Sequence, residues 1–216
     1  MKQLVIFDLD GTLLNTIDDL ACAANHALEA LGLPVRSQAE CQRFVGNGVG
    51  KLLERALPEG HKTPEDMEKI RPAFVAYYDQ HLADKTLPYT GLAALLAELQ
   101  RRGVKLAVAS NKYQSATERL VKHFFPQIHF VAVLGQREGI PTKPNPQIVE
   151  DILLAAGVSR EDTLYVGDSD VDMQTAKNAG VRVCGVLWGF RTKSVLAQYQ
   201  PDFLTENPAE ILNMLA

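Results

Sequence analysis

The sequence predicts an α/β fold, in which a doubly wound, mostly parallel sheet carries an inserted, all-helical cap domain. Short apolar runs rich in β-branched residues alternate with amphipathic segments of helical period. This alternation is typical of parallel sheets that are covered by helices on both faces. The chain between residues 15 and 84 departs from it, because that segment contains helical patterns and no convincing strand. We therefore expect residues 1–14 and 85–216 to form the core and residues 15–84 to form the cap.

The core elements follow one another in regular order. Apolar runs predict strands over 4–7, 104–109, 129–134, 163–167 and 181–186. Amphipathic segments predict helices over 92–102, 115–123, 146–156, 172–179 and 208–215. Gly103, Gly157 and Gly180 directly follow three of these helices, where glycine is common as a C-terminal cap. The order of elements predicts a Rossmann-like core.

The inserted segment has its own helix signals. A helical period runs over 16–31 and stops at Gly32. Ser37 and Glu40 have the spacing of a capping box, which predicts that a helix starts there. Further helices are expected over 48–57 and 64–83, the second with proline at its first position.

Composition excludes several classes of protein. The 22 Lys and Arg against 26 Asp and Glu give a net charge of -4, and no basic run is interleaved with aromatic residues, so we expect no nucleic-acid partner. No segment approaches the ~18 apolar residues of a membrane span, so we expect no membrane association. The 3 cysteines are widely spaced and no signal-peptide pattern precedes the first strand, which predicts reduced thiols and a cytoplasmic location. Nothing in the sequence indicates the oligomeric state.

Polar residues follow the apolar runs, at the edge where open α/β sheets bind ligands. Asp8 and Asp10 come after the first run, and residues i and i+2 of a strand point to the same side. Two carboxylates that face one spot need a cation or a shared proton between them. The residues that follow the later runs are Ser110, Asn111, Lys112, Lys143, Asp168, Ser169, Asp170 and Asp172. We expect these groups to share one site.

This set of side chains suits phosphoryl transfer supported by Mg²⁺. Carboxylate oxygens favour Mg²⁺ over softer metals. One carboxylate can attack phosphorus and form an aspartyl-phosphate, and a second acid can protonate the leaving alkoxide and then accept a proton from water. A hydroxyl, backbone amides at a helix start and a lysine can hold the phosphate oxygens.

Ordered motifs along the chain resemble those of the haloacid dehalogenase-like hydrolases. They are Asp8-Leu9-Asp10-Gly11-Thr12-Leu13, Ser110-Asn111-Lys112, Lys143-Pro144-Asn145-Pro146 and Gly167-Asp168-Ser169-Asp170-Val171-Asp172. The resemblance spans nearly the whole chain, and a helical insertion after the first motif matches one cap type of that superfamily. Within the superfamily, the segments 44–57 and 186–191 make the chain most similar to phosphoglycolate phosphatases.

The resemblance implies a role for each motif residue. Asp8 would be the nucleophile and a Mg²⁺ ligand, and Asp10 the acid and base, which also gives its backbone carbonyl to Mg²⁺. Asp168 would be the remaining metal ligand, supported by Asp172. The residues that would bind phosphate or substrate are Thr12, Ser110, Asn111 and Lys143. In this superfamily an acid at the position of Asp10 goes with phosphatases and phosphomutases rather than with cleavage of carbon–halogen bonds.

The cap offers weaker candidates around Gly46-Asn47-Gly48-Val49-Gly50-Lys51. The segment is no P-loop, because the spacing is wrong, Leu52 stands where Ser or Thr is needed, and no strand precedes it. It is either a turn between helices or a loop whose amides reach the substrate when the cap closes. Arg43 and Lys51 are either surface charges or partners of a substrate carboxylate. We expect Asp170 to cap a helix, and Trp188 and Arg191 to be packing and surface residues.

The sequence thus predicts a Mg²⁺-dependent phosphatase that hydrolyses a small phosphorylated metabolite through phosphorylated Asp8. The resemblance favours 2-phosphoglycolate as the substrate. The alternatives are a phosphatase for pyrophosphate, a sugar phosphate or a nucleotide, and a phosphomutase. A non-catalytic binding module is least expected, because a binder has no need of a nucleophile paired with an acid.

Overall fold

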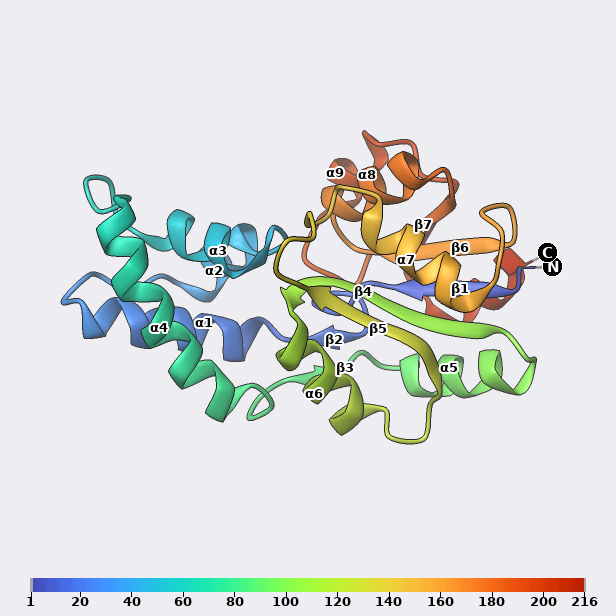
Figure 1. The fold of residues 1–216 in the computed structure, drawn as a ribbon, viewed down its shortest axis with the longest axis horizontal. Helices are drawn as coiled ribbons and strands as arrows, with labels where there is room; N and C mark the ends of the chain where they lie inside the picture. The colour runs from blue at the N-terminus through green and yellow to red at the C-terminus, as the bar shows by residue number, and fades with distance from the viewer. Residues whose placement is uncertain (1, 216) are drawn as a thin grey trace.

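A computed structural model describes residues 2–215 of the chain. Helices α1–α4 lie together on one side of the molecule, and the main sheet with its flanking helices lies on the other (Figure 1). The backbone N–H of Lys2 donates to the carbonyl of Leu215 over 2.6 Å, so the two ends of the described chain lie side by side. Within residues 2–215, no helix is both long enough and apolar enough to cross a lipid bilayer.

The core sheet has six strands in the order β5-β4-β1-β6-β7-β8, and each neighbouring pair is parallel. The strands are β1 (Leu4–Phe7), β4 (Lys105–Tyr113), β5 (Phe130–Gln136), β6 (Thr163–Gly167), β7 (Arg182–Val186) and β8 (Phe203–Thr205). The predicted parallel sheet is confirmed. Two details differ from the prediction. β8 has only three residues and gives no readable apolar run, and β4 continues past residue 109 through polar residues to Tyr113.

Helices cover both faces of this sheet, with α7, α8 and α9 above it and α5 and α6 below it in Figure 1. Alternate residues of β1 serve the two faces: Val5 and Phe7 pack into one buried cluster, and Leu4 and Ile6 pack into the other. The helices are α5 (Leu92–Arg101), α6 (Gln114–Phe124), α7 (Gln147–Ala156), α8 (Asp170–Ala179) and α9 (Lys193–Ala197). A sheet buried on both faces explains why its strands are apolar throughout.

Two predicted helices need correction. The segment Pro208–Leu215 forms a 3₁₀ helix, η1, rather than an α-helix. Helix α8 starts two residues before the predicted residue 172, because Ser169 caps it. The hydroxyl of Ser169 accepts a hydrogen bond from the backbone N–H of Asp172 at 3.2 Å. Asp170 is therefore the first residue of the helix and not its cap.

Helices α1–α4 share a buried apolar interior. They are α1 (Ile17–Ala30), α2 (Gln38–Phe44), α3 (Gly48–Ala56) and α4 (Pro64–His81). The capping box of Ser37 and Glu40 is present at the start of α2, as predicted. Leu28, Leu53 and Phe74 belong to the same buried cluster, which continues into one face of the core sheet.

The two chain segments that join α1–α4 to the core lie against each other. They pair as a short antiparallel ladder of β2 (Leu14–Asn15) and β3 (Leu87–Pro88), which the sequence does not predict. The buried carboxylate of Asp19 accepts hydrogen bonds from the backbone N–H and the hydroxyl of Thr86, at 2.8 and 2.7 Å. These contacts fix where α1–α4 stand over the ends of the core strands.

Candidate active site

One pocket lies where the carboxyl ends of the central strands face helices α1–α4. From the predicted site, its lining includes Asp8, Asp10, Ser110, Asn111, Lys143, Asp168, Gly46 and Gly48. Other lining residues are Leu20, Val45, Phe74, Tyr78, Lys112 and Arg191. The strand ends that the sequence assigns to one edge therefore do converge, and the helical unit closes the space above them.

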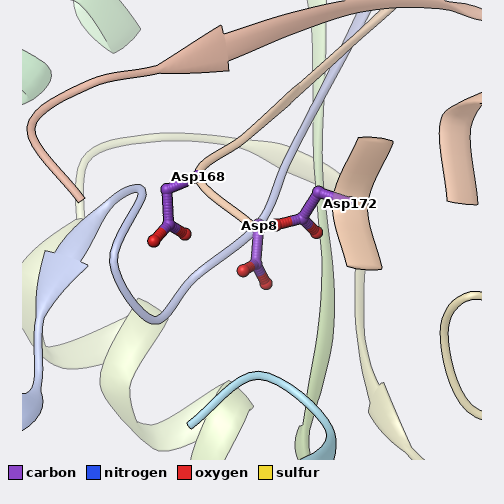
Figure 2. Close-up of side chains that lie close together, drawn as sticks. All are labelled: Asp8, Asp168 and Asp172. Carbon is purple, nitrogen blue, oxygen red and sulfur yellow. The ribbon is translucent and has the colours of Figure 1, made fainter. Parts of the chain in front are cut away.

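Three buried carboxylates lie together at the base of this pocket, and two of them, Asp8 and Asp168, line it. One oxygen from each of Asp8, Asp168 and Asp172 lies within 4.8 Å of the other two, and Figure 2 shows the side chains converging. Asp8 extends the pairing of β1, because its backbone N–H donates to the carbonyl of Val166 at 2.9 Å. The fully buried Thr12 donates its hydroxyl to Asp168 at 3.1 Å, so its side chain supports that carboxylate rather than lining the pocket.

The turn after β1 presses closely on Asp168. Gly11 has φ of 88°, and a Cβ at this position would lie 2.4 Å from Asp168 Oδ2. A Cβ on Gly189 would lie 2.3 Å from Asp168 Cβ. Only glycine allows both backbone segments to close around this carboxylate.

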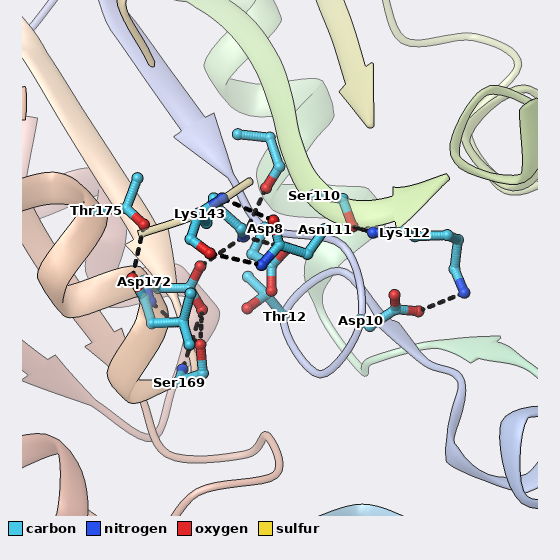
Figure 3. A network of polar contacts seen from close by, with 12 residues as sticks. Asp8, Asp10, Thr12, Ser110, Asn111, Lys112, Lys143, Ser169, Asp172 and Thr175 are labelled. Atoms are coloured by element: carbon cyan, nitrogen blue, oxygen red, sulfur yellow. Dashed lines mark hydrogen bonds and ion pairs between the residues drawn. The ribbon is translucent and has the colours of Figure 1, made fainter. Parts of the chain in front are cut away.

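Lys143 neutralises part of the charge of the carboxylates. Its Nζ lies 2.9 Å from Asp8 Oδ1 and 2.7 Å from Asp172 Oδ1, and it also donates to the carbonyl of Ala109 at 2.9 Å (Figure 3). The other oxygen of Asp172 accepts a hydrogen bond of 2.6 Å from the Ser169 hydroxyl. Both oxygens of Asp172 are thus engaged, which places it in a supporting position behind Asp8.

Negative charge exceeds positive charge at the base of the pocket. Burial and the charge of Asp172 raise the pKa of Asp8 well above its usual range, although Lys143 acts in the opposite direction. Burial and Asp172 also raise the pKa of Asp168 from 3.8 to about 7. Burial opposes the charge of Lys143, but Asp172 and Asp8 outweigh burial and raise its pKa well above the usual range. Carboxylates that resist ionisation without a cation, and that offer only oxygen ligands, fit a hard divalent ion such as Mg²⁺.

Asp10 lines the same pocket, but its carboxylate has different partners from those of Asp8. Its Oδ1 accepts a hydrogen bond of 2.6 Å from Thr16 and lies 3.3 Å from Lys112 Nζ. The two aspartates of the first motif therefore lie in one pocket but have different partners. Asp8 pairs with Lys143, and Asp10 pairs with Lys112 (Figure 3).

Lys112 lies in the pocket with the other residues that follow the strands, as expected, but the sequence assigns it no role. Strand β4 continues to Tyr113, and Ser110 and Lys112 both line the pocket. The backbone N–H of Lys112 donates to the Ser110 hydroxyl at 3.2 Å. The sequence predicts that this strand ends at residue 109, so it does not predict the contact between Lys112 and Asp10.

Asn111 holds the pocket together through its side-chain amide. Its Nδ2 donates to the carbonyls of Gly46 and Lys143, each at 3.1 Å, and its Oδ1 accepts from the Lys143 backbone N–H at 2.9 Å. The backbone of Gly48 passes so close that a Cβ there would lie 3.1 Å from the Asn111 carbonyl oxygen. Asn111 thus joins the lysine-bearing loop to the helical unit.

The remaining cap candidates lie outside the pocket lining. Arg43 is exposed, and Lys51 is exposed and paired with Glu54 at 2.6 Å. The side chain of Asn47 accepts a hydrogen bond of 2.8 Å from Arg55. The structure does not bring these three side chains to the strand ends.

Arg191 lies in the pocket wall rather than at the surface. Its guanidinium donates to the carbonyls of Gln42 at 3.1 Å and Val45 at 2.5 Å, and it pairs with Asp170 at 3.3 Å. Trp188 donates its indole N–H to the carbonyl of Thr12 at 3.0 Å. The sequence expectation for Arg191 is wrong, because its partners in the helical unit are backbone carbonyls, which leave no trace in a side-chain pattern.

Comparison with known proteins places this site in a family. Residues 5–186 match the family model described as haloacid dehalogenase-like hydrolase. A phosphoglycolate phosphatase from Mesorhizobium japonicum is 32% identical over 203 residues, which cover 93% of this chain and 89% of the relative. One from Neisseria meningitidis is 34% identical over 219 residues, which cover 99% and 93%. The crystal structure of a predicted phosphoglycolate phosphatase from Haemophilus somnus superposes with a TM-score of 0.92 at 30% identity, covering 100% of this chain and 98% of that one. The chain belongs to the haloacid dehalogenase-like hydrolases.

Proposed function

We propose that this chain is a Mg²⁺-dependent phosphatase that hydrolyses 2-phosphoglycolate through a phosphorylated Asp8. The observation that carries the proposal is the position of Asp8, which lies 2.9 Å from Lys143 and in one pocket with a second acid, Asp10. The similarity to full-length phosphoglycolate phosphatases supports the choice of substrate. A small phosphorylated metabolite is the expected partner.

The reaction has two steps. In the first, an Asp8 oxygen attacks phosphorus, the bond from phosphorus to the ester oxygen breaks, and the leaving oxygen takes a proton from Asp10. In the second, water attacks phosphorus, Asp10 takes the proton, and the bond to Asp8 breaks, which releases phosphate. Ser110 and Lys143 hold the non-bridging oxygens through both steps.

Asp8, Asp168 and the backbone carbonyl of Asp10 are the groups that would hold Mg²⁺. When bound, the ion supplies positive charge that offsets the carboxylates and the phosphate. Asp172 keeps Lys143 in place rather than serving as a ligand, because both of its oxygens are already engaged. Thr12 orients Asp168.

Residues 15–84 act as a cap, and residues 1–14 and 85–216 act as the catalytic core. The contact of Asn111 with Gly46 and the contacts of Arg191 with Gln42 and Val45 support a closed arrangement in which the cap covers the strand ends. Closure excludes bulk water while phosphorus is transferred.

The free thiols of Cys22, Cys41 and Cys184 support a cytoplasmic location. A reducing compartment keeps such cysteines unpaired, whereas oxidising compartments favour disulfides.

A panel of phosphate esters tests the proposal. The protein is assayed with Mg²⁺ on 2-phosphoglycolate, pyrophosphate, sugar phosphates and nucleoside monophosphates, with a chelator as the control. We expect the highest kcat/KM for 2-phosphoglycolate and no turnover with the chelator. Failure to release phosphate from any ester would refute the phosphatase, and an isomerised product that requires a bisphosphate would identify a phosphomutase.

A further inference from the structure

Lys112 is a buried cation that takes no part in the reaction steps described above. Its side chain is 4% exposed, and its Nζ lies 2.8 Å from the hydroxyl oxygen of Tyr78 and 3.3 Å from Asp10 Oδ1. The same ammonium lies 4.5 Å from the centre of the Tyr78 ring. Burying a lysine is unfavourable unless its charge is paired. Asp10 supplies that pairing, which keeps a positive charge in the lining of the pocket, where it can meet an anionic group of a substrate.

The other cations that line the pocket are already engaged. Lys143 is bonded to Asp8, Asp172, the carbonyl of Ala109 and the hydroxyl of Tyr165, and the proposed reaction assigns it to the phosphate oxygens. Arg191 binds backbone carbonyls of the helical unit. Lys112 also has three N–H groups, and within residues 2–215 its Nζ has two partners, which leaves one N–H for a substrate oxygen.

The position of Lys112 next to Asp10 defines what that N–H can reach. Asp10 must lie within about 2.6–3.2 Å of the ester oxygen that it protonates. Lys112 stands 3.3 Å from the same carboxylate, on the side away from Lys143 and Asp172 (Figure 3). An anionic group one carbon beyond the ester oxygen therefore falls within reach of the Lys112 ammonium.

We propose that Lys112 recognises the carboxylate of a phosphorylated 2-hydroxy acid, and that Tyr78 is the residue that positions its ammonium. This inference rests on the proposed function, because it takes Asp10 as the acid that protonates the leaving oxygen. Tyr78 is fully buried on α4, so a residue of the cap orients the Lys112 ammonium that binds the substrate carboxylate. The exposed Arg43 and Lys51 of the cap have no part in this recognition.

Two substrates that differ in one group test the role of Lys112. 2-Phosphoglycolate carries a carboxylate where 2-hydroxyethyl phosphate carries a neutral hydroxymethyl group. We expect Lys112→Met to lower the ratio of kcat/KM for the acid to kcat/KM for the alcohol by about a hundredfold, as for the loss of a buried charge-assisted hydrogen bond. Tyr78→Phe should lower the ratio in the same direction by about tenfold, mainly through KM. Lys122→Met, which changes an exposed lysine on α6, is the matched control and should leave the ratio unchanged.

The possible outcomes separate the two proposals. If wild-type protein hydrolyses 2-phosphoglycolate and Lys112→Met slows both substrates equally, Lys112 acts only on Asp10 and the inference is overturned. If wild-type protein releases no phosphate from 2-phosphoglycolate, the proposed function fails first. Inhibition by glycolate supplies a second readout, since its inhibition constant should rise in Tyr78→Phe even if Lys112→Met does not fold. An unchanged constant in a folded Tyr78→Phe protein would contradict the positioning role.

Discussion

Replacing Asp168 with Asn should remove a pH-dependent loss of stability from the metal-free protein. Burial and the charge of Asp172 raise the pKa of Asp168 from 3.8 to about 7 in the folded state. Between these pH values the unfolded chain has released this proton and the folded protein still holds it. The folded state therefore binds more protons, and its stability falls as the pH rises from about 4 to about 7.

The magnitude follows from the size of the shift. A pKa raised from 3.8 to about 7 corresponds to a loss of about 4 kcal/mol in the free energy of unfolding, complete once the pH exceeds the folded-state value. Asn at this position does not titrate. In wild-type protein the backbone N–H of Phe190 donates to Asp168 at 2.7 Å, and the hydroxyl of Thr12 donates to the other carboxylate oxygen. The carbonyl oxygen of Asn can still accept from Thr12, but its NH₂ group would then face the N–H of Phe190, which is a second donor. That mismatch adds an offset that does not depend on pH.

Urea unfolding in a chelator from pH 4.5 to 8.5 measures the difference between the two proteins. We expect Asp168→Asn to gain about 3 kcal/mol of stability relative to wild type between pH 4.5 and pH 8.5. Added Mg²⁺ should stabilise wild type more at pH 8 than at pH 5, because the ion binds the ionised carboxylate. If the difference in free energy of unfolding between Asp168→Asn and wild type changes by less than about 1 kcal/mol over this pH range, the argument from the charge of Asp168 is refuted.

Two further substitutions test the packing of the buried carboxylates. Lys143→Met leaves the buried carboxylates of Asp8 and Asp172 without their cation. We expect the free energy of unfolding, measured in chelator at pH 7.5, to fall by about 3–5 kcal/mol and phosphate release to be lost. A fall of less than about 1 kcal/mol would contradict the pairing. Gly11→Ala places a Cβ 2.4 Å from Asp168 Oδ2, so Mg²⁺ affinity measured by calorimetry should fall with stability. Gly60→Ala is its matched control, with φ of 87° and open space around the Cβ, and equal effects of the two changes would show that only backbone strain matters.

The sequence predicts the parts of this protein whose signals are local. Asp8 and Asp168 each follow a fully buried strand directly, so the apolar run and the abrupt carboxylate together place both at one sheet edge. The capping box of Ser37 and Glu40 is a pattern of four residues, and it correctly predicts the start of α2. A parallel sheet with helices on both faces follows from the alternation of elements.

The parts that the sequence does not predict depend on contacts between distant segments. Lys112 meets Tyr78 across 34 residues, and Arg191 meets backbone carbonyls 146 and 149 residues away. Asp10 resembles Asp8 in the sequence, yet its partners are Thr16 and Lys112 rather than the carboxylate cluster. Polar residues end the apolar run of β4 at residue 109, although parallel pairing carries the strand on to Tyr113.

The most direct test of the central claim is the rate of phosphate release from 2-phosphoglycolate by wild-type protein and Asp8→Asn, measured side by side with Mg²⁺. Asn is nearly isosteric with Asp, and its amide is a far weaker nucleophile toward phosphorus than a carboxylate. We expect wild-type protein to turn over and the variant to lose more than about a thousandfold in kcat while remaining folded. A folded Asp8→Asn protein that keeps a tenth or more of the wild-type rate would contradict catalysis through a phosphorylated Asp8.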